Sequence, residues 1–156
     1  LALGGSGLSG LRVIASCYQI MKFRLGKVGK RETSRRSKAQ SIINDISSSY
    51  CTLGLWGPKA PQILQSVTQT DVSNPAFKFF TQQQFYIGYI PVLASRVSYV
   101  GEAGWEIYAP TESGLKLWDL LWAAGQAHGL IAAGLGAFET LRLEKGFLYL
   151  GARYPH

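Results

Sequence analysis

The chain has 156 residues, 47% of them hydrophobic, which allows one domain with a sizeable core and excludes collagen-like, disordered and disulfide-rich classes. No uninterrupted apolar run approaches the roughly 20 residues that a membrane helix needs, so we expect no membrane partner. No cysteine or histidine stands at metal-ligand spacing from Cys17 or Cys51. We therefore expect reduced thiols and no metal site.

The net charge of +7 lies in one segment. Eight basic residues and one acid fall between Lys22 and Lys38, whereas the rest of the chain carries eight of each sign. Three interpretations are open: a nucleic-acid-binding patch, an organelle-targeting leader and a solvated extension. Because Phe23 is the only aromatic residue in the run, we predict no nucleic-acid partner. We divide the chain into a basic, poorly patterned segment, 1–49, and a domain over 50–156.

The patterns sharpen after this segment. Residues 51–56 form a short apolar run closed by a Gly-Pro pair, which predicts a strand. A short helix follows, in which Ile63, Leu64 and Val67 are spaced to share one buried face. Pro61 must then lie in its first turn, where proline is tolerated.

Loop and strand signals alternate in the middle of the chain. Residues 71–75 combine Asp, Ser, Asn and Pro, which is turn chemistry. The runs 85–90 and 92–100 are rich in aromatic and β-branched residues and predict strands.

A hairpin is predicted where the run 92–100 is followed by Gly-Glu-Ala-Gly at 101–104 and Trp-Glu-Ile-Tyr at 105–108. If Val100 pairs with Trp105 across a four-residue loop, Tyr99 lies opposite Glu106. Tyr99, Glu106 and Tyr108 then share one face, and a carboxylate stands between two phenols. The other face carries Val100, Trp105 and Ile107.

Two helices complete the predicted fold. The first is capped by Thr111, ends at His128-Gly129 and has an apolar face made of Leu115, Trp118, Leu121 and Trp122. The second starts near Ala137, has Phe138 and Leu141 inward, pairs Glu139 with Arg142 on its exposed side, and stops at Gly146. Strands and helices do not alternate strictly, which favours an α+β fold.

Few residues point to chemistry by themselves. Residues 5–10 match G-x-G-x-x-G, but too few residues precede them for the strand of a dinucleotide site, so a flexible start is favoured. His128 follows a helix, where a structural role is favoured. Glu106 has two open interpretations, a solvated strand face and a held carboxylate whose two acceptors match a ligand edge with adjacent N–H donors.

Several motifs occur together in order. They are G-L-W-G-P-K-A at 54–60, D-V-S-N at 71–74, R-V-S-Y-V-G-E-A-G-W-E-I-Y at 96–108, A-G-L at 133–135 and L-R-L-E-K-G at 141–146. With these spacings, residues 50–151 resemble the folate-binding aminomethyltransferase domain of the glycine cleavage T-protein family. The similarity is greatest to the version fused behind a flavin oxidoreductase in dimethylglycine and sarcosine dehydrogenases.

The resemblance implies a fold and a function. The fold is an incomplete domain with an antiparallel sheet, helices on one face and ferredoxin-like halves. The function is tetrahydrofolate-binding one-carbon transfer of an aminomethyl or iminium unit, with Glu106 on the pterin ring and Tyr99, Ile107 and Tyr108 lining the pocket. No residue is assigned a catalytic role, because the protein positions reactants and excludes water.

The resemblance also implies partners. FAD belongs to a companion flavin oxidoreductase domain or subunit outside this chain, and the relatives indicate the mitochondrial matrix. The chain is then part of a larger enzyme and is inactive in isolation.

Two departures favour an alternative. Phe138 stands where the T-protein has an arginine, and the stretch from Gly4 to Leu11 lacks the acid that orients the folate amine in the family. The alternative is a non-catalytic regulatory or binding relative, similar to the regulatory subunit of pyruvate dehydrogenase phosphatase.

Overall fold

A computed structural model describes the backbone of residues 13–18 and the whole of residues 48–147 apart from the side chain of Leu135. In chain order the elements are β1 Val13–Tyr18, β2 Tyr50–Trp56, α1 Ala60–Val67, β3 Gln82–Ile87, β4 Ile90–Ser95, β5 Gly104–Pro110, η1 Thr111–Ser113, α2 Gly114–Gly125, η2 Gln126–His128, β6 Leu130–Ala132 and α3 Leu135–Glu144. The glycine-rich stretch at 5–10 and the basic run at 22–38 lie outside the described residues.

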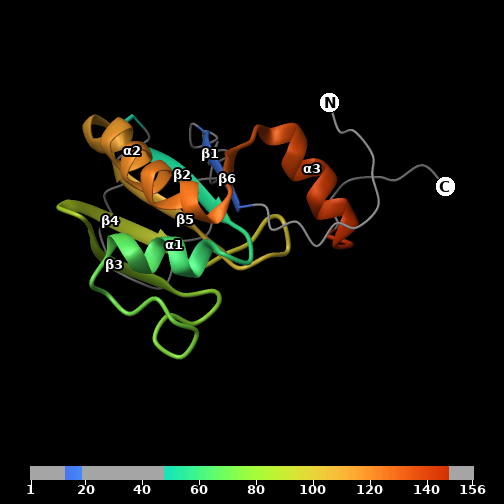
Figure 1. The fold of residues 1–156 in the computed structure, drawn as a ribbon, viewed down its shortest axis with the longest axis horizontal. Helices are drawn as coiled ribbons and strands as arrows, with labels where there is room; N and C mark the ends of the chain where they lie inside the picture. Colours follow the sequence, from blue (N-terminus) through green and yellow to red (C-terminus); the bar gives the residue numbers. More distant parts are fainter. Residues whose placement is uncertain (1–12, 19–47, 148–156) are drawn as a thin grey trace, which may run out of the picture.

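The strands form one six-stranded sheet in the order β3-β4-β5-β2-β1-β6 (Figure 1). All neighbouring strands are antiparallel except β1 and β6, which are parallel. The α+β prediction is confirmed. The sheet also includes β1, whose backbone pairs with β2, so residues 13–18 of the predicted N-terminal segment contribute a strand.

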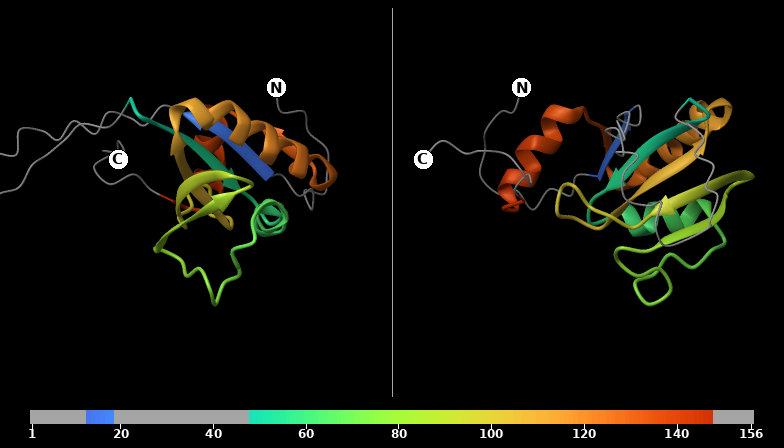
Figure 2. Two further views of the ribbon diagram at one scale, coloured as in Figure 1. Left: turned by 90° about the vertical axis from the view of Figure 1, so that its left-hand side faces the viewer. Right: turned by 180° about the vertical axis from the view of Figure 1, so that it is seen from behind.

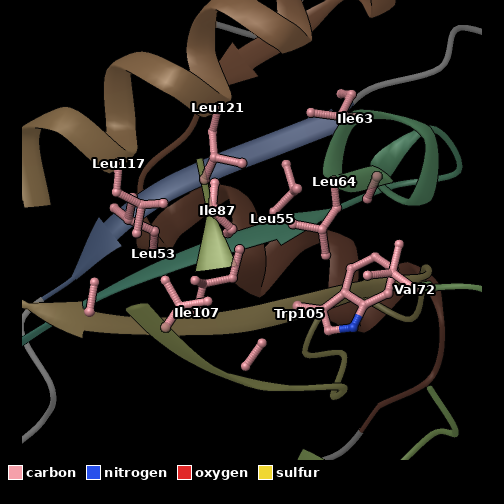
Figure 3. Close-up of a cluster of buried hydrophobic side chains, with 14 of the residues drawn as sticks. Leu53, Leu55, Ile63, Leu64, Val72, Ile87, Trp105, Ile107, Leu117 and Leu121 are labelled. Carbon is pink, nitrogen blue, oxygen red and sulfur yellow. The ribbon is translucent and has the colours of Figure 1, made fainter. Parts of the chain in front are cut away.

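Helices α1 and α2 cover one face of the sheet (Figure 2). The main core fills the space between these helices and the sheet. Side chains from alternate strand positions meet side chains from both helices (Figure 3). Leu53, Leu55, Ile63, Ile107, Leu117 and Leu121 belong to this cluster and are 0–2% exposed. Helix α3 lies apart from α1 and α2, at the other end of the sheet (Figure 1).

The predicted strand and helix at the start of the domain are confirmed. Strand β2 is buried from Thr52 onward, and it lies inside the sheet with β1 and β5 paired to its two edges. Helix α1 has Pro61 in its first turn and buries Ile63 and Leu64. The loop after it is held by Asp71, whose side-chain oxygen accepts a hydrogen bond from the Ser73 backbone at 2.8 Å.

The next two strands differ from the prediction. The turn falls at Gly88 and Tyr89, because Ile87 pairs with Ile90 and Gly88 has the positive φ of 57° that tight hairpin turns favour. Strand β3 therefore starts earlier and ends earlier than the run 85–90 suggested.

The predicted four-residue hairpin loop is wrong. Strand β4 ends at Ser95, and it is Ser95 that lies opposite Glu106 in β5. The chain leaves the sheet at Arg96, whose backbone N–H donates to Thr81 at 3.0 Å, and whose guanidinium lies 5.3 Å from the ring centre of Trp105. An eight-residue connection, 96–103, replaces the tight loop.

The helix predicted after Thr111 begins differently. The Thr111 hydroxyl donates to the Ser48 carbonyl at 3.0 Å rather than capping α2, and a short 3₁₀ turn precedes the helix. The buried face of α2 also differs from the prediction, because Leu115 is 74% exposed while Leu117 is buried. Leu121 faces the core as predicted, and Trp118 and Trp122 pack against it with stacked rings 5.8 Å apart.

Helix α3 confirms most of its prediction. Phe138 is buried, Leu141 packs beside it, and Gly146 follows the helix with a positive φ of 73°. Glu139 and Arg142 form the expected ion pair at 2.6 Å, but Arg142 is only 7% exposed. The prediction of a surface pair was wrong for the arginine.

No helix within the described residues has the length and apolar character needed to cross a membrane. The same residues hold no group of three or more side chains that could bind a metal ion.

Candidate functional site

Polar side chains collect on the sheet face that α1 and α2 leave uncovered. Glu106 is central in this face, with Gly54 of β2 on one side and Ser95 of β4 on the other. Tyr108 lies two residues along the same strand and is half-buried, as is Glu106. The predicted alternation is confirmed for this strand, because Trp105 and Ile107 are buried on the opposite face.

A line of hydrogen bonds ends at Glu106. Gln82 donates its side-chain N–H to the Ser95 hydroxyl at 2.8 Å, and Ser95 in turn hydrogen-bonds Tyr108. The Tyr108 hydroxyl donates to Glu106 Oε2 at 2.6 Å. The carboxylate accepts this hydrogen bond, so Tyr108 helps to orient it.

The surroundings raise the pKa of Tyr108 above its ordinary value of 10.0. Burial of the phenol is the main cause, the hydrogen bond and the negative charge of Glu106 add to it, and the hydrogen bond with Ser95 acts in the opposite direction. Tyr108 therefore stays a donor at neutral pH.

This raised pKa predicts a loss of stability at alkaline pH. Above about pH 10 the unfolded tyrosine releases its proton while the folded one keeps it, so the stability contribution present below pH 10 falls as pH rises toward the folded pKa. Urea denaturation between about pH 8 and 11 should show a steeper decline for the wild type than for Tyr108→Phe, by at most about 1.4 kcal/mol per pH unit. Equal slopes would contradict this assignment.

Trp56 bounds the site on the β2 side. Its indole ring folds over Gly54, since a Cβ at Gly54 would lie 2.2 Å from two ring carbons. The indole N–H donates to the Val97 carbonyl at 2.9 Å, and the ring is 0% exposed. Gly54 thus lets a large aromatic ring lie directly beside the strand position opposite Glu106. Sequence reasoning placed Trp56 only as the last residue of a strand.

A second small core lies behind Trp56 and contains Tyr99. Phe138 meets the Trp56 ring edge-to-face at 5.1 Å, and Val100 is buried with them. The Tyr99 hydroxyl donates to Glu139 at 2.8 Å. Tyr99 therefore does not lie opposite Glu106, contrary to the sequence prediction, because the chain has already left the sheet at Arg96.

The four predicted site residues are thus divided by the structure. Glu106 and Tyr108 are in direct contact, and Tyr99 belongs to the α3 contact. The side chain of Ile107 is 0% exposed in the main core, on the opposite face of β5 from Glu106. Ser95 and Gln82 were missed. Their position beside Glu106 could not be predicted from the sequence, because it depends on the register between β3, β4 and β5.

Comparison with known sequences identifies the family of the chain. Residues 18–154 match the GCVT N-terminal domain. The chain is 42% identical over 110 residues to the mitochondrial dimethylglycine dehydrogenase of Mus musculus, covering 70% of this chain and 13% of that protein. It is 43% identical over 109 residues to an aminomethyltransferase of Thermoanaerobacter pseudethanolicus, covering 70% of this chain and 29% of that protein. The chain therefore spans well under half the length of these relatives.

The fold has a counterpart among solved structures. It is similar to a chain of the heterotetrameric sarcosine oxidase from Corynebacterium sp. U-96, with a TM-score of 0.54 and 21% identity, covering 63% of this chain and 49% of that chain. At this identity the likeness concerns the fold. Because the domain match covers most of its residues, the chain belongs to the GCVT N-terminal domain family.

Proposed function

We propose that this chain is the tetrahydrofolate-binding part of a one-carbon transfer protein, and that Glu106 receives the pterin ring. The observation that supports this most is the line of donors that ends on Glu106. A carboxylate with a set orientation presents two acceptors in one plane, which matches the two adjacent N–H donors of an amino-pyrimidine edge. Membership of the GCVT N-terminal domain family agrees with this ligand class.

The neighbouring residues fit such a ring. Thr52, which pairs with Tyr108 across β2 and β5, is 1% exposed, and its hydroxyl has no hydrogen-bond partner among the described residues. A buried hydroxyl without a partner is costly, so it is a candidate to meet a polar ligand atom after a small side-chain movement. The phenol of Tyr108 adds an aromatic surface beside the carboxylate.

The part played by the protein is then positioning. Glu106 binds and orients the ring, Tyr108 holds the carboxylate, and the sheet face with its flanking cores excludes water. Tetrahydrofolate supplies the nitrogen that accepts the one-carbon unit. No described side chain needs to form a covalent bond, so the rate depends on the fixed geometry of this face.

The context of the whole protein follows from the relatives. The mouse relative is a dehydrogenase and the bacterial relative an aminomethyltransferase, and this chain spans only part of each. We infer that the one-carbon unit comes from an N-methyl amine oxidised by a companion flavin domain or subunit that binds FAD. The mitochondrial relatives support the mitochondrial matrix as the location, whereas bacterial relatives also match. The isolated chain would then bind folate without completing a reaction cycle.

The test replaces the carboxylate by a neutral side chain of the same shape. Glu106→Gln should weaken tetrahydrofolate binding roughly 10- to 100-fold, because a charge-assisted pair of hydrogen bonds is lost. Isothermal titration calorimetry measures the change directly. Glu144→Gln is the matched control, because Glu144 is exposed at the end of α3, which is not part of the sheet face that carries Glu106. Equal affinity of the Glu106→Gln variant and the wild type would refute the assignment of Glu106.

A second candidate is a non-catalytic regulatory or binding relative, similar to the regulatory subunit of pyruvate dehydrogenase phosphatase. The observation that favours it is the burial of Phe138 against Trp56, which leaves an apolar contact where the T-protein has an arginine. A folded wild-type chain that binds no tetrahydrofolate but forms a stable complex with a partner enzyme would support this candidate.

A further inference from the structure

Strand β3 forms one edge of the sheet, because among the described residues it pairs only with β4 (Figure 1). Backbone N–H and C=O groups of an antiparallel strand point alternately toward one neighbour and away from it. The Thr81 carbonyl points toward β4, where it accepts the Arg96 N–H at 3.0 Å. The backbone groups of Gln82, Gln84 and Tyr86 therefore point away from β4, toward the open edge.

One half of this edge is already covered by the loop that follows α1. The Thr68 hydroxyl donates to the Tyr86 carbonyl at 2.6 Å, and the Gly88 N–H donates to the Val67 carbonyl at 2.9 Å. No described residue hydrogen-bonds the outward backbone groups within 82–84. The open part of the edge is therefore this short stretch.

The open stretch lacks the features that protect sheet edges. Natural edge strands usually carry a charged side chain, a proline or a bulge that prevents pairing with another chain. Residues 82–84 are three glutamines, and β3 pairs with β4 at every position without a bulge. The Gln84 side chain is exposed and has no hydrogen-bond partner among the described residues. Because this stretch is uncharged, it does not repel a second copy of itself.

Exposed aromatic rings flank the open stretch on both sides. Phe79 and Phe80 precede it and are 53% and 79% exposed, with ring centres 4.3 Å apart, and Tyr86 follows it and is 61% exposed. Phe80 has a positive φ of 61°, which is unusual for a bulky residue. Its backbone N–H donates to the Arg96 carbonyl at 2.9 Å. The loop therefore holds both phenylalanine rings in an exposed position beside the edge.

We propose that β3 pairs with β3 of a second copy of this chain, antiparallel and with Gln83 opposite Gln83. The open backbone groups decide this register, because Gln82 of each copy then exchanges hydrogen bonds with Gln84 of the other. The same register brings Phe80 toward Tyr86 of the second copy, so that both exposed rings lose contact with water. The interface is two-fold symmetric, since each copy contributes the same residues.

The inference does not depend on the proposed function. Pairing at β3 extends the sheet at its edge and leaves the face that carries Glu106 uncovered. Glu106→Gln should therefore dimerise like the wild type, whatever its affinity for tetrahydrofolate.

Sedimentation equilibrium of the full chain tests the pairing. So few hydrogen bonds predict a weak dimer, with a dissociation constant of about 10–500 µM. Gln84→Pro should raise this constant at least about 10-fold, because proline removes the outward N–H and breaks no bond to β4. Gln84→Lys should do the same, because the two lysines lie diagonally across the pair and repel. Gln126→Lys is the matched control, because Gln126 is exposed in η2, which leads into β6 at the opposite edge of the sheet.

A mixture of Gln84→Lys and Gln84→Glu gives the sharpest readout. Each variant alone should be monomeric where the wild type is dimeric, and the mixture should form a heterodimer, because opposite charges then meet across the pair. Circular dichroism checks that each variant is folded. A wild type that stays monomeric throughout this concentration range, dimers that persist in folded Gln84→Pro and Gln84→Lys, or a mixture that stays monomeric would overturn the inference.

Discussion

Gly54→Ala is expected to destabilise the protein by about 3 kcal/mol, because the added methyl group has no space. Its carbon would lie 2.2 Å from two ring carbons of Trp56. The ring cannot move away easily, since it is fully buried, donates to Val97 and packs against Phe138. Strand β2 must therefore shift where it pairs with Glu106, so the variant should also bind tetrahydrofolate more weakly.

Gly136→Ala is the matched control for this prediction. Gly136 lies in α3, and a Cβ there would meet no atom within 4 Å. The same substitution should therefore stabilise the protein by about 0.5–1 kcal/mol, because alanine is the better helix former. Urea denaturation of both variants gives the comparison. A Gly54→Ala protein as stable as the wild type would show that Trp56 does not pack over β2.

Phe138→Ala is expected to have a comparable or larger effect, about 3–5 kcal/mol. The Phe138 side chain is 2% exposed and joins α3 to the sheet through its contact with Trp56. Loss of the ring leaves a cavity in the second core and weakens the packing of α3 against the sheet. The hydrogen bond from Tyr99 to Glu139 can still form in the variant. The near-ultraviolet circular dichroism of the aromatic residues should decrease, because Trp56 loses its ring neighbour.

Leu143→Ala serves as the control on the same helix. Leu143 is 53% exposed, so the substitution should change the free energy of unfolding by no more than about 0.5 kcal/mol. If the two alanine variants are equally stable, Phe138 does not anchor α3. An arginine in place of Phe138 would bury a charge among aromatic rings, so an apolar side chain suits this contact.

Features that depend on neighbouring residues in the chain were predicted well. Short-range periodicity predicted strand β2 and the buried faces of α1 and α3, and the structure has the same strand and the same buried faces. The placement of Glu106 and Tyr108 on one face follows from strand alternation in the same way. The role of Glu106 did not follow from the residues alone, because a solvated face satisfies the same alternation.

Features that depend on distant contacts were not predicted. Arg96 takes the chain out of the sheet through bonds to Thr81 and Phe80, which no local pattern reveals. The burial of Arg142 depends on Glu139 and on the Phe147 carbonyl, which accepts its N–H at 2.7 Å. Leu115 is exposed and Leu117 is buried, so α2 packs on the sheet through a different face from the one that the apolar spacing predicted. The Arg96 contacts join residues far apart in the chain, whereas the partners of Arg142 lie within five residues of it, around the end of α3.

The most direct test of the central claim is a crystal structure of the chain with tetrahydrofolate bound. The proposal predicts that both oxygens of Glu106 lie about 2.7–3.1 Å from the amino-pyrimidine N–H groups, with Tyr108 still donating to the carboxylate. A pterin ring bound elsewhere, or bound on this face without contact to Glu106, would contradict the claim.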